Sequence, residues 1–239
     1  MTEIWDVDLE AQGPDWERYS SLLEENERAR AWKFVSMELR QRYAVTRGVL
    51  RILAGRKLNR APEDIRFEYS AHGKPSIAHG SNIFINVSHS GNRAAIAFSS
   101  AEVGVDIERV RSFSEPMNLV RRFFSVQERE VFEGVRSEDQ EVLFFRCWTR
   151  KEAFVKALGA GLSLGLDTFT VPMLADCSDR PLVQDPRTPE RWWRFVPLEL
   201  EDGYVGTVVV DPTAEDINQR QWLGLDPYSS ATIRQAQNS

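Results

Sequence analysis

The sequence predicts an α+β fold, because long helical patterns and short strand patterns occupy separate stretches of its 239 residues. Three segments have the residue pattern of helices: 15–58, 125–135 and 142–158. Short apolar runs bounded by turn residues are typical of strands, and two of them, 82–88 and 94–98, are separated by a Ser-Gly-Asn turn. We therefore expect helices packed against antiparallel hairpins.

In the first half, Glu38 to Leu58 has apolar residues at three- and four-residue steps and lacks proline, which predicts a long helix. Ile65 to Tyr69 alternates apolar and polar residues, as a half-buried strand does. Gly73-Lys74-Pro75 is typical of a turn. Gly104 to Val110 is rich in Val and Ile, which favours another strand.

In the second half, Ser125 is followed three residues later by Glu128, the spacing of a helix capping box. We expect strands at Thr168–Met173 and Tyr204–Val210, and a loop at Asp176–Pro189, which is rich in Pro, Asp and Ser. The two halves of the sequence resemble each other weakly. Thr46-Arg47 and Arg150-Lys151 each precede a helical run, and the two runs end at the same distance from these pairs, in Gly55 and Gly159.

The composition excludes several functional classes. The net charge of −6 argues against a nucleic-acid-binding protein, which is usually basic. No apolar run approaches the roughly 20 residues that span a bilayer, and Met1 to Glu10 lacks the basic start of a secretory signal. Cys147 and Cys177 are too few for a disulfide framework, so we expect a cytoplasmic protein without membrane contact.

The first chemical signal is the segment Val103-Gly104-Val105-Asp106-Ile107-Glu108. Alternate residues of a strand share a face, so Asp106 and Glu108 project together, and the aliphatic residues between them point into the core. Two neighbouring carboxylates repel each other unless a cation lies between them, and Mg²⁺ prefers such oxygen ligands. The alternative is a solvated strand face on which Glu108 pairs with Arg109 or Arg111.

The second signal is the helix that contains Glu152 and Lys156, four residues apart. They supply a third carboxylate and a cation for a site that binds metal and pyrophosphate, or else they form a surface ion pair. Lys151 falls within the apolar arc of this helix, so it must extend to solvent or meet an anion.

The third signal is Asn86-Val87-Ser88-His89-Ser90-Gly91, which ends a strand with groups that bind phosphate oxygens. A Ser-His hydrolase is rejected, because adjacent strand residues face opposite ways and the chain has no G-x-S-x-G motif. The alternative is a turn in which Ser88 bonds its own backbone. For Arg47, in the middle of a helix, the simplest interpretation is an exposed salt bridge.

In this order the motifs resemble the Sfp-type 4′-phosphopantetheinyl transferase family, most clearly over residues 40–170. The matching motifs are Gly73-Lys74-Pro75, Asn86 to Ser90, Gly104 to Glu108, Arg122-Phe123-Phe124-Ser125 with Glu128, Trp148 to Lys156, and Gly161-Leu162-Ser163 with Leu166-Asp167. The resemblance implies two similar α+β halves about a pseudo-twofold axis, residues 1–102 on the coenzyme A side and 103–239 on the catalytic side.

The resemblance also implies the role of each site residue. Asp106, Glu108 and Glu152 would hold Mg²⁺, with Asp106, Glu152 and Lys156 as catalytic residues. Coenzyme A would be bound by these residues: Arg47, Lys74, Pro75, Ser88, His89 and Lys156.

The activity implied is attack by a carrier-protein serine on the β-phosphate of coenzyme A, which releases 3′,5′-ADP, with Glu152 as the candidate base. Two alternatives remain open: a non-catalytic module that binds coenzyme A or a carrier protein, and a metal-dependent coenzyme A pyrophosphate hydrolase. The partners expected are coenzyme A and an acyl, peptidyl or polyketide carrier protein.

The weak duplication predicts a monomer, because one chain would complete the cleft. We expect the carrier protein to dock on Met117–Phe124, where Arg121 and Arg122 lie among apolar residues. The alternative is that the phenylalanines of this segment are buried and its arginines cap a helix end.

Overall fold

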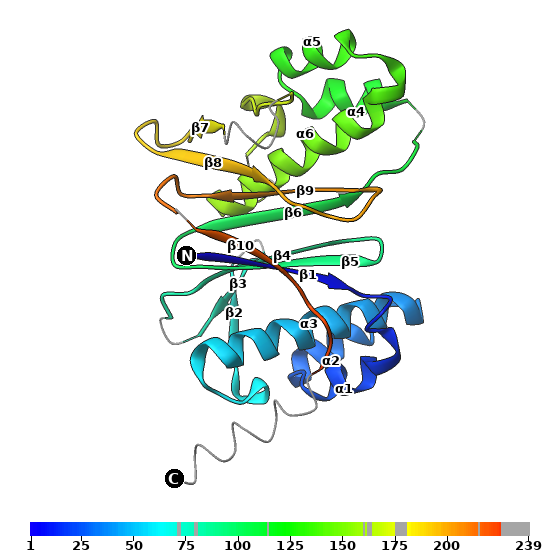
Figure 1. Ribbon diagram of the computed structural model, residues 1–239, viewed down its shortest axis with the longest axis vertical. Helices are drawn as coiled ribbons and strands as arrows, with labels where there is room; N and C mark the ends of the chain where they lie inside the picture. Colours follow the sequence, from blue (N-terminus) through cyan, green and yellow to red (C-terminus); the bar gives the residue numbers. More distant parts are fainter. Residues whose placement is uncertain are drawn as a thin grey trace.

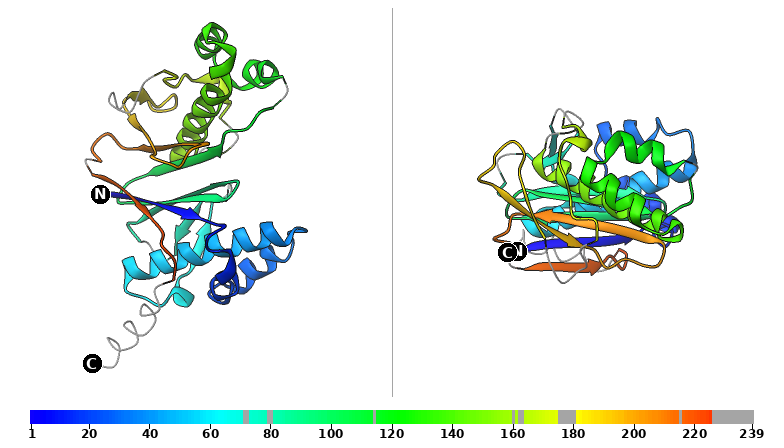
Figure 2. Two further views of the ribbon diagram at one scale, coloured as in Figure 1. Left: turned by 45° about the vertical axis from the view of Figure 1, so that its right-hand side comes forward. Right: turned by 90° about the horizontal axis from the view of Figure 1, so that it is seen from above.

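A computed structural model describes residues 1–70, 73–78, 81–113, 115–159, 161, 164–174, 181–214 and 216–225. Two β-sheets lie against each other in the middle of the molecule, with helices on the outer side of each, so the chain forms four layers (Figures 1 and 2). This arrangement confirms the α+β fold. None of the helices in the described part of the chain combines the length and the apolar character of a membrane-spanning segment.

The first sheet has the strand order β10-β1-β5-β4-β3-β2. Its strands are β1 (Thr2–Asp8), β2 (Phe67–Tyr69), β3 (Pro75–Ile77), β4 (Phe84–Ser90), β5 (Arg93–Ser99) and β10 (Ile217–Gln221). Neighbours within it are antiparallel, except that β10 returns from the C-terminal part of the chain and pairs in parallel with β1. The division of the chain between residues 102 and 103 stays a prediction.

Three helices, α1 (Trp16–Ser21), α2 (Glu25–Ala31) and α3 (Met37–Leu58), cover the outer face of this sheet (Figure 1). They confirm the predicted helical stretch 15–58. The middle of α3 is buried, and the helix ends at Asn59, whose left-handed conformation is a common helix stop.

The second sheet has the strand order β6-β9-β8-β7 and is covered by α4, α5 and α6 (Figure 1). Its elements are β6 (Val103–Arg109), β7 (Leu182–Gln184), β8 (Trp192–Pro197), β9 (Tyr204–Val210), α4 (Pro116–Phe123), α5 (Val126–Gly134) and α6 (Ser137–Leu158). The predicted capping box is confirmed, because Ser125 and Glu128 bond each other's backbone N–H groups. Helix α6 ends at Gly159, whose φ of 62° favours glycine.

An apolar layer joins the two sheets. Val103, Val105 and Ile107 of β6 pack against Ala95 and Ala97 of β5. The prediction that the aliphatic residues of the acidic strand point into the core is therefore confirmed. The apolar layer packs β6 against the first sheet.

Several sequence-based expectations need correction. No strand forms at Thr168–Met173: a 3-10 helix covers Leu166–Thr168, and Val171 and Met173 are buried in a loop. The backbone there turns because Val171 N–H is bonded to the buried Glu128 carboxylate instead of a neighbouring strand. The expected loop at Asp176–Pro189 contains β7, while residues 176–180 lie outside the described part of the chain, as do Leu162 and Ser163.

Lys151 is fully buried, and it meets an anion rather than extending to solvent. Its Nζ lies 2.7 Å from Oε2 of Glu128, and it donates to the carbonyl oxygens of Leu166 (2.6 Å) and Phe169 (2.8 Å). The single ammonium group thereby ties α6 to the start of α5 and to the loop that follows α6.

Candidate functional site

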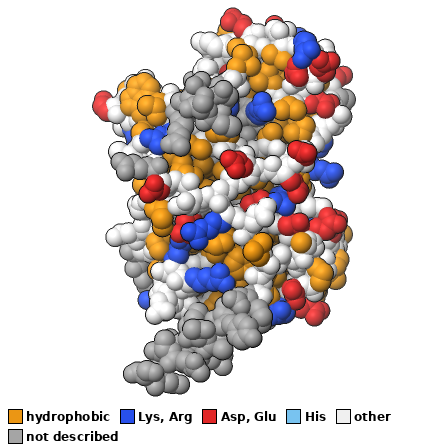
Figure 3. All heavy atoms as spheres, viewed as in Figure 1, with side chains coloured by type: hydrophobic (Ala, Val, Ile, Leu, Met, Phe, Trp, Pro, Cys, Tyr) orange, Lys and Arg blue, Asp and Glu red, His pale blue; other side chains and the backbone are white. Residues whose placement is uncertain are grey.

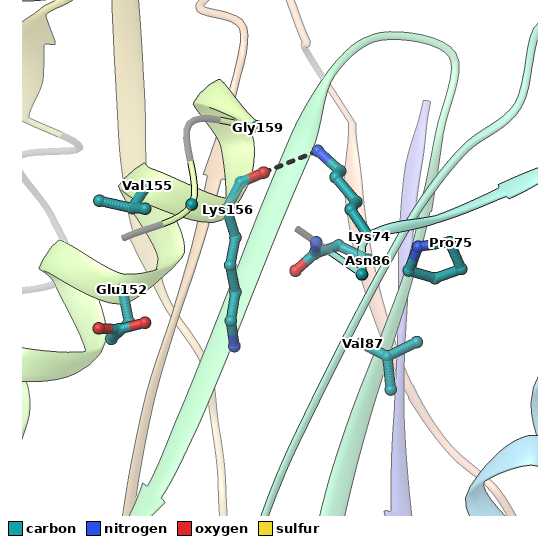
Figure 4. Close-up of a pocket in the computed structure, with 10 residues that line it drawn as sticks. Lys74, Pro75, Asn86, Val87, Glu152, Val155, Lys156 and Gly159 are labelled. Atoms are coloured by element: carbon teal, nitrogen blue, oxygen red, sulfur yellow. Dashed lines mark hydrogen bonds between the residues drawn. The ribbon is translucent and has the colours of Figure 1, made fainter. Parts of the chain in front are cut away.

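A cavity of about 430 Å³ opens between the two halves of the molecule. Its lining comes from the Gly73 turn and β4 on one side and from the last turns of α6 on the other (Figure 4). The lining residues are Gly73, Lys74, Pro75, Asn86, Val87, Glu152, Val155, Lys156, Gly159 and Gly161. Motifs separated by about 80 residues in the sequence thus face one space.

The close approach of α6 to β6 depends on Gly104. A Cβ atom at this position would lie 1.9 Å from the carbonyl oxygen of Ala153 and 2.4 Å from the nitrogen of Ala157, both in the helix backbone. No side chain fits there. The missing side chain allows α6 to place Glu152 and Lys156 beside Asp106, two residues further along β6.

Asp106 is buried, and its Oδ1 atom is fully engaged. It accepts a hydrogen bond from the Ser88 hydroxyl (2.7 Å) and forms an ion pair with Lys156 Nζ (2.7 Å). Oδ2 is buried without a hydrogen-bond partner among the described residues. An unpartnered buried carboxylate oxygen is costly, so this atom is suited to accept a bond from a water molecule or a ligand, or to bind a cation.

Glu108 and Glu152 are affected by the same environment. Partial burial, together with the neighbouring Asp106 charge, raises the pKa of Glu108 above its ordinary value, although its Oε2 accepts a 2.5 Å hydrogen bond from Ser90. Burial, the Asp106 charge and, more weakly, Glu108 raise the pKa of Glu152. Glu108 thus bonds a serine of β4, and Lys156 pairs with Asp106, so neither forms the surface ion pair that was the alternative.

Lys74 connects the two halves. Its Nζ donates to the carbonyl oxygen of Lys156 (2.7 Å) at the end of α6 (Figure 4). It also donates to the carbonyl oxygen of Val103 (3.1 Å) in β6. Burial lowers the pKa of Lys74 to about 8, against the weaker opposing effect of Glu102. A lysine with this pKa carries a charge for an anionic ligand at neutral pH and loses it in mild alkali.

The structure also separates Ser88 from His89, as expected for adjacent residues of a strand. Ser88 is buried against β6, whereas the His89 side chain stays exposed on the side of α3. Partial desolvation and the positive charge of Lys156 lower the pKa of His89, and Arg42 of α3 adds to this effect. Arg42 is therefore a further cation near the site that sequence reasoning did not single out; it also bonds the side chain of Asn92.

Arg47 lies apart from the cavity lining. Its Nε donates to Oε1 of Glu27 at 2.8 Å, and it also contacts the Tyr69 hydroxyl and the Phe67 ring. Both members of the Arg47–Glu27 pair are buried, so the expected exposed salt bridge is wrong. A role of Arg47 in binding coenzyme A stays a prediction.

The carboxylates of Asp106, Glu108 and Glu152 fit a hard cation such as Mg²⁺ only if phosphate oxygens or water molecules complete its coordination. Among the described residues, no three His, Cys, Asp or Glu side chains converge closely enough to hold a metal by themselves. Asp106 Oδ2 nevertheless lacks a partner in the described part of the chain, and burial, together with repulsion by Asp106, raises the pKa of both Glu108 and Glu152. Mg²⁺ commonly takes one or two carboxylates and completes its shell with phosphate oxygens and water, so these residues fit it.

The cavity of this α+β protein has two lysines in its wall and three carboxyl groups in or beside it. Lysines bind phosphate oxygens and carboxylates bind Mg²⁺, so the site is suited to a phosphorylated substrate. Comparison with known proteins gives the family. A sequence model of the 4′-phosphopantetheinyl transferase superfamily matches residues 102–209, and a model of the N-terminal part of 4′-phosphopantetheinyl transferases matches residues 9–101.

Two curated relatives support the same family assignment. The chain is 32% identical to the 4′-phosphopantetheinyl transferase Sfp of Bacillus subtilis over 82% of this chain and 81% of the relative. It is 34% identical to the 4′-phosphopantetheinyl transferase HetI of a Nostoc species, over 67% of this chain and 69% of HetI. The chain belongs to the 4′-phosphopantetheinyl transferase family and is of the Sfp type, and the predicted enzyme class is confirmed.

Proposed function

We propose that this protein transfers the 4′-phosphopantetheine group of coenzyme A to a serine hydroxyl of an apo carrier protein and releases 3′,5′-ADP. The observation that carries the proposal is the placement of Glu152 and Lys156 beside Asp106, at a cavity that is also lined by Lys74. The names of the relatives support the same reaction.

Glu152 is the general base of the proposed reaction. Its pKa is raised by burial and by Asp106, and a base is most effective when its pKa approaches the working pH. The carrier serine oxygen attacks the β-phosphorus of coenzyme A, and its proton passes to the Glu152 carboxylate, directly or through one water molecule.

Lys156 and Lys74 stabilise the phosphates. The bond that breaks joins the β-phosphorus to the bridging oxygen, so negative charge develops on the departing 3′,5′-ADP. The Lys156 ammonium lies at the cavity wall, where it can pair with that charge. Lys74 and Pro75, with Ser88 and His89 nearby, hold the nucleotide part of coenzyme A.

Asp106, Glu108 and Glu152 would hold Mg²⁺. When bound, the ion neutralises charge on the pyrophosphate and polarises the phosphoryl oxygen. Lys156 and Ser88 bond one carboxylate oxygen of Asp106, and no described residue bonds the other, which is therefore placed for this purpose. Magnesium binding by the enzyme with coenzyme A present is measurable by calorimetry, and we expect Asp106→Ala to abolish it.

The base assignment is tested by Glu152→Gln, which keeps the size of the side chain and removes the proton acceptor. We expect kcat to fall by about 10²- to 10⁴-fold, the usual contribution of general base catalysis, with coenzyme A binding retained. The matched control is Glu133→Gln on the exposed side of α5, which should leave turnover unchanged. Normal turnover by Glu152→Gln would refute the role of Glu152 as the base.

A further inference from the structure

The acidic strand β6 lies at the edge of its sheet. Among the described residues its only strand neighbour is β9, so one row of its backbone N–H and C=O groups has no described strand to pair with. Val103 to Ile107 are nevertheless buried. Buried backbone groups must find partners, and exposed strand edges are usually protected in some way.

Side chains of β4 accept hydrogen bonds from the backbone N–H groups on this edge of β6. The N–H of Val105 donates to Asn86 Oδ1 at 2.9 Å. The N–H groups of Ile107 and Arg109 donate to the hydroxyl oxygens of Ser88 (3.4 Å) and Ser90 (3.1 Å). The acceptors occupy every second position of β4, hence one face of that strand, and the residue numbers of both strands rise together.

The two serine hydroxyls also donate to the carboxylates of the same strand. Ser88 Oγ donates to Asp106 Oδ1 at 2.7 Å, and Ser90 Oγ donates to Glu108 Oε2 at 2.5 Å. Each serine therefore binds one backbone N–H and the carboxylate of the residue before it. This two-point contact restricts both the position of the backbone and the rotamer of the acidic side chain.

Lysines bind two of the carbonyl groups on this edge. Val103 O accepts from Lys74 Nζ at 3.1 Å, and Val105 O accepts from Lys156 Nζ at 3.2 Å. The unpaired edge of β6 is thus bound by side chains from β4, from the Gly73 turn and from α6. The same contacts fix the relative position of the elements that surround the cavity.

We propose that Asn86 and Ser90 are positioning residues of this enzyme: they bind the free edge of β6 and thereby hold Asp106 and Glu108 in their working arrangement. The inference rests on the proposed function of these two carboxylates. Ser90 acts on Glu108 directly, through its hydroxyl. Asn86 acts on the strand backbone, one residue before Asp106.

Amide hydrogen exchange tests the contacts without reference to activity. In Ser90→Ala, the N–H of Arg109 loses its acceptor, so it should exchange at least tenfold faster, while Val105 keeps its protection. In Asn86→Ala, the Val105 amide should become fast and Arg109 should remain slow. Ser99→Ala is the control, because this buried hydroxyl bonds Thr2 in the first sheet and should affect neither amide.

Kinetics test the positioning role. We expect Ser90→Ala to lower kcat about tenfold and to change KM for coenzyme A less than twofold, since Glu108 is displaced rather than removed. Ser90→Thr keeps a hydroxyl and should restore kcat to within threefold of wild type and return the Arg109 amide to slow exchange. Ser99→Ala should keep the wild-type kcat, even if its melting temperature falls as far as that of Ser90→Ala.

The outcomes separate this inference from the proposed function. Unchanged exchange at Arg109 in Ser90→Ala, or faster exchange with an unchanged kcat, would overturn the positioning role and leave the proposed function intact. Equal losses of kcat in Ser90→Ala and Ser99→Ala would also overturn it, because the effect would then follow stability alone. Failure of the wild-type enzyme to transfer phosphopantetheine to any carrier protein would instead overturn the proposed function, whatever the exchange rates, and full activity of Asp106→Ala would overturn the role of that carboxylate alone.

Discussion

The glycine at position 104 gives a sharp test of how the site is assembled. In Gly104→Ala the added Cβ would lie 1.9 Å from Ala153 O, whereas ordinary van der Waals contact begins at 3.4 Å, a deficit of 3.4 − 1.9 = 1.5 Å. The atoms that it meets belong to the backbone of α6, so no side-chain rotation relieves the overlap. Helix α6 must move away from β6 and take Glu152 and Lys156 with it.

A displacement of about 1 Å in a reacting group costs on the order of 10²-fold in rate. We therefore expect Gly104→Ala to lower kcat/KM at least about 100-fold. Overpacking typically costs about 1–3 kcal/mol, and because the contact is with backbone we expect the free energy of unfolding to fall by about 3 kcal/mol. Carrier modification followed by mass spectrometry measures the first effect, and urea denaturation measures the second.

The matched control is Gly134→Ala, because a Cβ at Gly134 meets no atom within 4 Å and its φ is not positive. This variant should keep the activity and stability of the wild type. If Gly104→Ala matched its control in both measurements, the contact between α6 and β6 would not set the geometry of the site.

Three further predictions concern charged groups. The pKa of Lys74 is about 8 in the folded protein and near 10.5 when unfolded, so between these values the unfolded chain binds more protons. The stability of wild type relative to Lys74→Met should therefore rise from pH 8 to pH 10 in urea titrations; parallel pH curves would exclude the shifted pKa. Lys151→Met leaves the buried Glu128 carboxylate without its ion pair and should cost about 3–5 kcal/mol of unfolding free energy, of which a double variant with Glu128→Gln should recover at least half. A loss below about 1 kcal/mol would show that the pair is dispensable. Arg121→Glu with Arg122→Glu should raise KM for the carrier protein but not for coenzyme A, with a smaller penalty at high salt; equal effects on both substrates would place the docking surface elsewhere.

The docking surface on Met117–Phe124 stays a prediction, and the structure shows which of its side chains are exposed. In α4, Arg121, Arg122 and Leu119 are exposed, whereas Phe124 is fully buried and Phe123 packs on Trp148. The phenylalanines therefore belong largely to the core, as the alternative held, and the arginines remain available to a partner. Figure 3 shows basic, acidic and hydrophobic side chains interspersed over one face, so on that face attraction of a carrier would depend on local groups rather than on one large charged area.

Local patterns in the sequence predicted the helices apart from α4, the hairpin β4–β5 and the acidic strand, because each depends on residues close together in the chain. The strand β1 was not predicted. Its buried face includes Asp6, and the charge of Asp6 is compensated by Arg93, 87 residues away. Strand β10 was missed for a similar reason, since it pairs with β1 from the opposite end of the sequence.

The site was predicted in part. The acidic strand and the helix that contains Glu152 were recognised because the motifs, in this order, resemble those of the family, and the carboxylate spacing agrees with that chemistry. The functions of Gly104, Asn86 and Ser90 depend on contacts between β6 and two other elements, and a single sequence does not show such contacts. The recurrence of small polar residues at positions 86, 88 and 90 was the available signal that one face of β4 binds polar groups.

The most direct test of the central claim is the product balance of one reaction. The enzyme is incubated with Mg²⁺, labelled coenzyme A and a panel of apo carrier proteins, and the carriers and nucleotides are analysed by mass. We predict that a carrier gains one phosphopantetheine on its serine for each 3′,5′-ADP released, and that Asp106→Ala gives neither product. Release of free phosphopantetheine without any carrier would identify a hydrolase, and bound coenzyme A without turnover would identify a binding module; either result would contradict the account.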